Sequence, residues 1–162
     1  MCTVWKIPRI MLLIFMVLPI SACQTSNFEY TPNAAGDWPV YDIEELLDKS
    51  DLVVYVKVME TENSKNGSLP IQLSTLSVIE SIKGEPDTDT IILDLSDPDY
   101  FVKSGSNYLM FLSNIGEHFT QIDPNSIIKE ENGKFKSSII GLNGEYSLTE
   151  IQSKISNLIN EP

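Results

Sequence analysis

The stretch DLVVYVKVMET, residues 51–61, decides the fold class of this chain. Apolar and other side chains alternate along it, which is the period of an extended strand with one face on a core. One face carries Leu52, Val54, Val56 and Val58, and the other carries Val53, Tyr55, Lys57 and Met59. The stretch therefore predicts a long strand, and NSKNGS after it, residues 63–68, predicts a turn or loop.

Further strands are predicted downstream. IQLSTLSVIESIKG (71–84), DTIILDL (89–95) and NYLMFLSN (107–114) are rich in apolar and β-branched residues. Shorter strands are predicted within HFTQI (118–122) and within SIIKEENGKFKSSI (126–139), where Asn132-Gly133 is a strong hairpin signal. About six or seven antiparallel strands at regular spacing indicate a small barrel or sandwich.

A helix is predicted on each side of these strands. Before them, Asp42 and Glu45 form a capping box for a short helix with one apolar face. After them, Ser147 and Glu150 form a second box at the start of SLTEIQSKISNLIN, whose apolar residues recur at helical spacing. The chain is thus predicted to be mostly β, of the all-β or α+β class, with a C-terminal amphipathic helix.

The first residues predict an export signal. Lys6 and Arg9 precede an apolar run at 10–20, too short for a comfortable membrane span, and the run ends in Ser21-Ala22-Cys23. Residues 20–23 resemble the lipobox of bacterial lipoproteins. That resemblance implies cleavage before Cys23 and a thioether-linked diacylglycerol there, with acyl chains such as palmitate holding the protein in the membrane.

The expected organisation follows directly. It comprises a signal peptide at 1–22, a lipidated flexible tether at 23–37 and a single domain at 38–162. The expected location is the extracytoplasmic face of a bacterial cell membrane; the abundance of Lys over Arg, with many Ile, Asn and Ser, hints at a Gram-positive cell.

Charge and cysteine content exclude several functions. Loss of Lys6 and Arg9 with the signal would leave nine lysines and 23 acidic residues, a net charge of −14 without arginine. Such a chain is a poor candidate for binding nucleic acid, which requires cationic contacts. Cys2 would be removed and Cys23 acylated, so no thiol would remain for a disulfide, a nucleophile or a thiolate metal site.

One constellation resembles a known module. Four stretches are similar to parts of small secreted bacterial proteins of unassigned function: LLDKSDLVVYVKV, SVIESIKGE, TIILDL and KSGSNYLMFL. They are similar, more distantly, to the netrin-like module of tissue inhibitors of metalloproteinases. The matching residues are Ser50, Asp51, Val54, Lys57, Val58, Val78, Ile82, Lys83, Gly84, Gly105, Tyr108, Leu109 and Phe111.

The resemblance implies an OB-like five-stranded barrel in which Asp51, Lys83, Gly84, Gly105 and Tyr108 are fold residues. The zinc-chelating N-terminal cysteine of the animal inhibitors does not carry over, because Cys23 would be acylated. From the residues themselves, Gly84 is expected to allow the turn out of the second strand, and Lys83 to keep an edge solvated.

Two constellations could carry chemistry. Asp94, Asp97 and Asp99 in LDLSDPDYF supply oxygen ligands of the kind that Ca²⁺ prefers, although their spacing does not match an EF-hand loop. The alternative is a solvated loop turned by Pro98, which we favour. His118 is the one histidine, and without a Gly-x-Ser-x-Gly elbow it does not define a hydrolase. No cofactor is predicted.

We therefore expect a non-catalytic binding module, lipid-anchored in the envelope, whose partner is an envelope protein, a peptide or a glycan. The alternatives are an inhibitor or modulator of an extracytoplasmic enzyme and, third, an envelope hydrolase. A hydrophobic groove flanked by exposed aromatic residues would favour the first. A rigid protruding loop at 97–101 or 64–69 would favour the inhibitor or modulator. A cleft that joins His118 to a serine and a carboxylate would favour the hydrolase.

Overall fold

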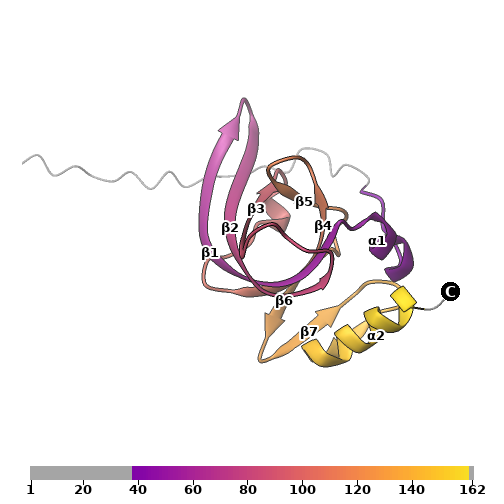
Figure 1. Cartoon of the computed structure of the whole chain (residues 1–162). Helices are drawn as coiled ribbons and strands as arrows, with labels where there is room; N and C mark the ends of the chain where they lie inside the picture. The colour runs from indigo at the N-terminus through magenta and orange to yellow at the C-terminus, as the bar shows by residue number, and fades with distance from the viewer. Residues whose placement is uncertain (1–37, 161–162) are drawn as a thin grey trace, which may run out of the picture. The chain divides into compact units, whose positions relative to one another are not determined.

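The computed structural model describes residues 38–160, which form a small β-barrel with one helix before its first strand and one after its last (Figure 1). The elements in chain order are α1 (Ile43–Lys49), β1 (Leu52–Asn66), β2 (Leu69–Lys83), β3 (Thr90–Leu95), the 3-10 turn η1 (Pro98–Tyr100), β4 (Asn107–Asn114), β5 (Phe119–Gln121), β6 (Ile127–Glu131), β7 (Lys134–Ser137), β8 (Gly144–Tyr146) and α2 (Leu148–Asn160).

Five strands close into a ring in the order β1-β2-β3-β5-β4 and back to β1. The closing contact is the antiparallel pairing of β1 with β4, from Leu52↔Leu112 to Lys57↔Asn107. A parallel contact, Leu93↔Phe119, joins β3 to β5, whereas the other pairings are antiparallel. The predicted OB-like barrel is confirmed, with this one parallel pair as a detail that the alternating patterns did not reveal.

Alternation along β1 and β4 feeds two separate cores. Side chains on one face fill the barrel interior, where Val54, Val56 and Leu93 are fully buried. Side chains on the other face, such as Val53 and Phe111, pack outside the barrel against the helices. Because both faces of β4 are covered, its central residues read as a continuous apolar run instead of an alternating one.

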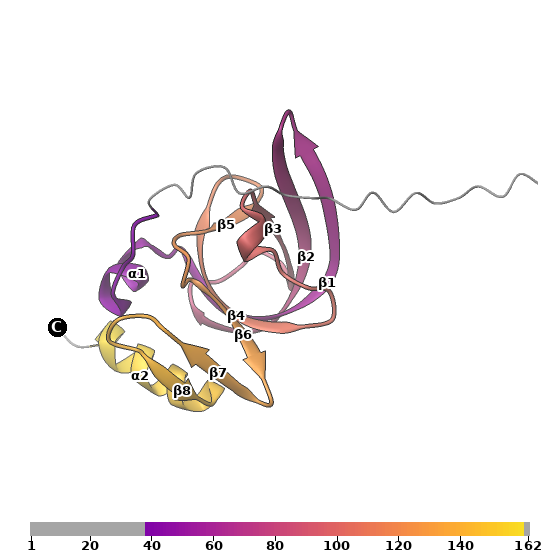
Figure 2. The same cartoon turned by 180° about the vertical axis from the view of Figure 1, so that it is seen from behind.

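The two helices begin where the capping boxes predicted. The Asp42 carboxylate accepts from Glu45 N at 2.9 Å, and Ser147 N donates to Glu150 Oε2 at 2.7 Å. Helix α2 lies along β7 and β8 (Figure 2), and its buried Ile151 and Ile155 belong to the same core as Phe135. Burying each such side chain contributes about 1.5–3 kcal/mol, so the helix is held mainly by packing.

The structure confirms one of the turns predicted from the sequence and shortens another. Asn132 and Gly133 both have positive φ, 55° and 77°, as a two-residue hairpin turn between β6 and β7 requires. The loop predicted at 63–68 is instead mostly strand, because β1 runs on to Asn66 and only Gly67 and Ser68 turn. The short strand β8 was not predicted.

The predicted signal peptide at 1–22, the tether at 23–37 and the lipidation residue Cys23 lie outside the described residues. None of the helices within 38–160 has the length and apolar character needed to cross a membrane.

Candidate functional site

The most prominent surface feature is the outer half of the β1–β2 hairpin, residues 60–75, which we call the hairpin arm. It rises beyond the rest of the barrel in both views (Figures 1 and 2). Its strands pair from Glu60↔Thr75 to Asn66↔Leu69. The partner of β1 on its other side, β4, ends at the pair Lys57↔Asn107. Within 38–160, the arm's β1 strand thus has a strand neighbour on one edge only.

The tip of the arm is a narrow two-residue turn. Gly67 has φ +64°, and a Cβ added there would meet nothing within 4 Å. A glycine at the first central position with positive φ is the signature of a type II′ turn, whose twist matches that of paired strands. Leu69 beside the turn is 63% exposed. The arm therefore presents a slim end with an apolar side chain in solvent.

Gln72 holds the root of the arm in place. Its side chain is buried, and its Nε2 donates to Asn63 Oδ1 at 3.1 Å across the hairpin and to Val102 O at 3.2 Å. Its Oε1 accepts from Val102 N at 2.8 Å. These bonds tie both arm strands to the β3–β4 connection, so the base of the arm is rigid. The sequence signal for this brace is a glutamine at a position of the strand where the alternation predicts a buried side chain.

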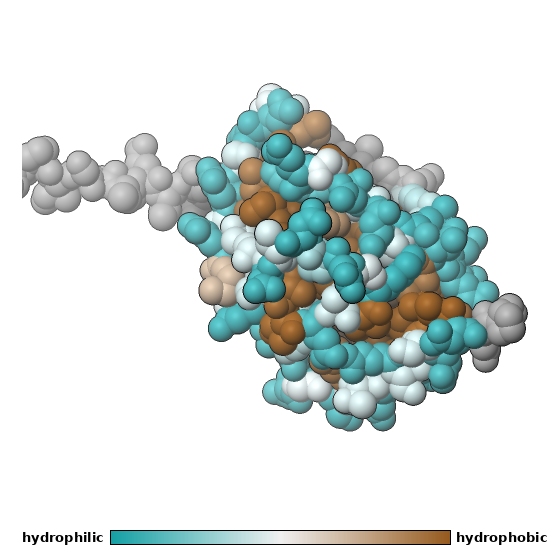
Figure 3. Space-filling model, in the orientation of Figure 1, coloured by the Kyte–Doolittle hydropathy of each residue, from teal (hydrophilic) through white to brown (hydrophobic). Residues whose placement is uncertain are grey.

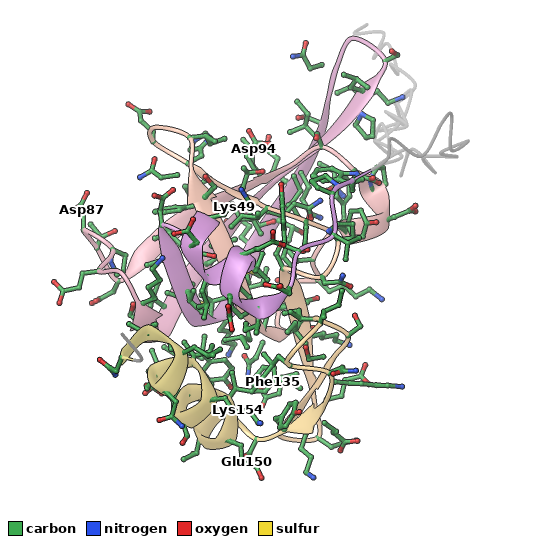
Figure 4. All side chains as sticks on the ribbon, turned by 90° about the vertical axis from the view of Figure 1, so that its right-hand side faces the viewer. Lys49, Asp87, Asp94, Phe135, Glu150 and Lys154 are labelled. Atoms are coloured by element: carbon green, nitrogen blue, oxygen red, sulfur yellow. The ribbon has the colours of Figure 1, made fainter. Side chains whose placement is uncertain are left out.

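A second feature is an acidic cavity of about 450 Å³ between the β2–β3 loop and the β4–β5 loop. Its apolar floor includes Ile92 and Phe119, and its charged lining residues are Glu85, Asp87 and Glu117. Asp87 projects from its loop away from the barrel (Figure 4). The lining of this cavity contains no lysine.

The structure separates the three aspartates predicted as cation ligands. Asp94 lies on β3, and its Oδ2 is 4.0 Å from His118 Nδ1. Asp97 caps η1, where its Oδ1 accepts from Asp99 N at 3.0 Å. Among residues 38–160, no group of three or more His, Cys, Asp or Glu side chains has a metal-holding arrangement.

Asp97 and Asp99 lie instead near Tyr100 and Asp123. Burial raises the pKa of Tyr100, and the three carboxylates raise it further. Asp123 is fully buried, and it accepts from Tyr41 N at 3.2 Å and from Asn125 N at 2.8 Å. It fastens the start of the domain to the β5–β6 turn, a structural role that the sequence did not reveal.

His118 has Asp94 as its recorded ion-pair partner within the described part of the chain. Both side chains are about one-third exposed, at 37% and 31%. Asp94 lies on β3 and His118 directly precedes β5, and the parallel pair Leu93↔Phe119 brings the two residues together. An exposed pair at 4.0 Å contributes little to stability.

Three of the five predicted fold residues meet where α1 passes into β1. Lys83 Nζ donates to Leu47 O at 2.5 Å and to Ser50 O at 2.7 Å, and so satisfies carbonyls at the end of α1. Asp51 Oδ2 accepts from Asn114 N at 2.7 Å. Lys83 thus caps a helix, which corrects the expectation that it keeps an edge solvated; tertiary contact places the helix end within its reach.

Gly84 has φ +76°, which confirms the predicted turn, but its larger role is close packing. A Cβ at this position would lie 2.3 Å from Asp51 O. Gly105 lies in the turn just before β4, and Tyr108 is the second residue of that strand. Gly105 N donates to Val58 O at 2.8 Å, and the buried Tyr108 accepts through its hydroxyl from Lys103 N at 3.1 Å. All of these residues hold the barrel together.

A polar triad on the outer wall also escaped the sequence analysis. Tyr55 Oη donates to Glu130 Oε2 at 2.8 Å, and Asn107 Nδ2 donates to that same carboxylate oxygen at 2.8 Å and to Tyr55 Oη at 3.0 Å. Burial raises the pKa of Tyr55, and the hydrogen bond to Glu130 raises it further. Cross-strand neighbours on β1, β4 and β6 are thereby joined.

The visible face in Figure 3 is mainly hydrophilic with several apolar patches, one of which lies in the region of α1 and α2. Ile159 at the end of α2 is 48% exposed. Comparison of the sequence with protein-family models and with curated proteins yields no match.

Proposed function

We propose that the protein is a lipid-anchored, non-catalytic binding module on the extracytoplasmic face of a bacterial membrane, and that it engages a partner protein through the hairpin arm. The observation that carries the proposal is the arm itself, a braced hairpin that extends beyond the barrel with one open strand edge. The anchor rests on the lipobox-like residues that end at Cys23.

An open strand edge favours recognition of an extended peptide segment. Its free N–H and C=O groups can pair with a strand of another protein, while neighbouring side chains select the partner. Exposed Met59 and Leu69 add apolar contact at the root and tip of the arm. The acidic Glu60 and Glu62 on the same strand favour a partner segment with basic side chains.

The proposed anchor limits where the partner can lie. Cys23 is 15 residues before Trp38. Fifteen residues span at most about 50 Å when fully extended. The partner surface must therefore be membrane-associated or lie close to the membrane.

A second candidate function is favoured by the same arm. A narrow, rigid hairpin is suited to inserting into the cleft of an extracytoplasmic enzyme, so the protein could act as its inhibitor or modulator. The arm protrudes at 64–69, as this alternative requires, and its root is held by the bond between Gln72 and Asn63. A hydrolase has less support, because the recorded partner of His118 in the described residues is Asp94.

The test is site-specific photocrosslinking at the native membrane. A photoreactive residue replaces Glu62 on the arm or, as the control, Glu145 on β8 at the opposite end of the domain (Figures 1 and 2). We expect one envelope protein to crosslink at the arm position and not at the control. Cys23→Ala should abolish the crosslink, and mass spectrometry should find diacylglycerol on a mature N-terminal Cys23 in the unaltered protein.

A shortened arm provides the matched loss-of-function variant. Asn63 and Gln72 face each other, so residues 64–71 can be replaced by Asn-Gly to close a two-residue turn. The barrel and the Gln72 brace remain. We expect normal folding and loss of the crosslinked partner; retention of the partner would exclude residues 64–71 of the arm as its contact. If the captured partner is an enzyme, its activity is measured with the full-length arm and with the shortened arm. Inhibition by the full-length arm alone distinguishes an inhibitor from a simple binding module.

A further inference from the structure

The hairpin of β6 and β7 places two lysines against each other. The pairs of this hairpin are Glu130↔Phe135 and Glu131↔Lys134, and Lys129 and Lys136 are the next residue on each strand, one position beyond the last pair. Residues directly opposite in an antiparallel pair share a face, with Cβ atoms about 4.5–5.5 Å apart. Like charges at that spacing destabilise a hairpin. An acidic chain with nine lysines after position 22 nevertheless brings two of them together here.

The neighbouring glutamates neutralise the charge of only one of these two lysines. Lys129 Nζ is 3.8 Å from Glu131 Oε1. Glu145, the cross-strand partner of Lys136, is paired instead with Lys134 at 3.7 Å. The Lys136 side chain makes no hydrogen bond or ion pair with any of residues 38–160. A cation without a counter-charge thus stands beside a second cation.

Both lysines line a cavity of about 240 Å³. On its far side, Asn125 Oδ1 accepts from Ser138 Oγ at 2.8 Å, which leaves the Asn125 amide N–H groups as donors. Asn125 is itself held by its backbone N–H, which donates to the buried Asp123 at 2.8 Å. The cavity therefore combines two ammonium groups with an amide donor, and Glu131 is its one acidic lining residue.

We propose that this cavity binds a phosphoryl group between Lys129 and Lys136. Ammonium groups bind phosphate as point charges, and an amide donor suits a remaining oxygen. The volume exceeds that of the phosphoryl group alone, so the group can be a free phosphate or part of a phosphodiester. The site lies on β6 and β7, away from the hairpin arm, so it stands independently of the proposed function.

The test compares phosphate with chloride at equal ionic strength, using the intact chain purified in nonionic detergent. Inorganic phosphate and a soluble glycerol phosphodiester are titrated separately by calorimetry, and thermal unfolding is followed in parallel. We expect saturable binding of at least one probe and a higher Tm in that probe than in chloride. Preference for one of the two identifies the source of the phosphoryl group.

Three variants make the outcome specific. Lys129→Gln and Lys136→Gln should each weaken phosphoryl binding about tenfold or more, the loss of one charge-assisted contact. Lys134→Gln should leave it unchanged, because Lys134 lies on the same hairpin but outside the cavity lining. Without phosphate, Lys136→Gln should not lower Tm, since it removes a repulsion. Equal effects of phosphate and chloride, or unchanged binding in both cavity variants, would overturn the proposal.

Discussion

The ammonium group of Lys83, the last residue of β2, lies 2.7 Å from the carbonyl oxygen of Ser50, the residue that ends α1. A second bond from the same group reaches Leu47 O. One lysine from the barrel thus satisfies two carbonyls at a helix terminus, and it joins the barrel wall to the helical layer 33 positions earlier in the chain.

Lys83→Met should destabilise the protein, because it removes both bonds and leaves the Ser50 carbonyl without its lysine donor, while Leu47 O keeps its bond from Ser50 N at 3.3 Å. We expect a loss of about 1.5–3 kcal/mol in the free energy of unfolding, measured by urea denaturation. Lys103→Met is the control, since the Lys103 side chain is exposed and makes no recorded bond within 38–160. Equal losses in the two variants would argue against the capping role.

Gly84→Ala and Gly67→Ala form a matched pair that separates backbone strain from close packing. Both glycines have positive φ, 76° and 64°, so both variants carry a conformational cost of about 1–2 kcal/mol. Only at Gly84 does the new Cβ collide with Asp51 O. We expect Gly84→Ala to cost roughly 3 kcal/mol or more. Similar denaturation midpoints for the two variants would contradict this packing explanation.

Tyr55→Phe should change how stability depends on alkaline pH. The pKa of Tyr55 is raised above its ordinary 10.0 by burial and by Glu130. A raised pKa in the folded state means that the contribution is fully present below pH 10 and is lost as pH rises through the folded value. At pH 7 the variant should lose about 1 kcal/mol with the hydrogen bond.

The difference in stability between wild type and Tyr55→Phe should therefore shrink as pH rises above 10 and through the raised pKa of folded Tyr55. Tyr100 also has a raised pKa, but it is common to both proteins and cancels in the difference. A difference that stays constant across this range would show that Tyr55 ionises equally in the folded and unfolded states.

The capping box of α2 predicts an effect at acidic pH. Hydrogen bonds from Ser147 N and then from its hydroxyl lower the pKa of Glu150. The contribution of Glu150 is therefore present above the ordinary carboxyl pKa and is lost as pH falls through the lower folded value. Unfolding of Glu150→Gln followed from pH 7 to 3 should show less acid sensitivity than wild type.

Ser147→Ala should lower stability at pH 7 by about 1 kcal/mol, the usual cost of losing an N-cap. The same substitution should weaken the pH dependence that Glu150 confers, since it deletes the hydroxyl that donates to Glu150 Oε2 at 2.8 Å. Full acid sensitivity in Ser147→Ala would assign the effect to other carboxylates.

Much of the fold could be predicted because its signals are local. A capping box needs only residues three apart, as with Asp42 and Glu45, and Asn132-Gly133 defines a turn within its own backbone. The same local turn brings the strands that carry Lys129 and Lys136 together, so the nearness of these two lysines was deducible from the sequence. The cavity was not, because Asn125 and Ser138 come from segments that meet only in the folded chain.

The three aspartates of LDLSDPDYF show where local sequence information fails to predict a site. Asp94, Asp97 and Asp99 are close in sequence, yet Asp94 stands on a strand face beside His118 and Asp97 turns back to cap η1. Proximity in sequence does not bring carboxylates together when the backbone changes direction between them.

The sequence by itself determined where strands, helices and most turns form, and it carries the lipobox-like end at Cys23, because these depend on short-range periodicity and hydrogen bonding. Only the tertiary structure decided the ring closure of β1 on β4, the parallel contact of β3 with β5, and the length of the hairpin arm beyond that ring. Those features depend on pairing between segments far apart in the chain, whose loop-closure entropy must be offset by the two cores together.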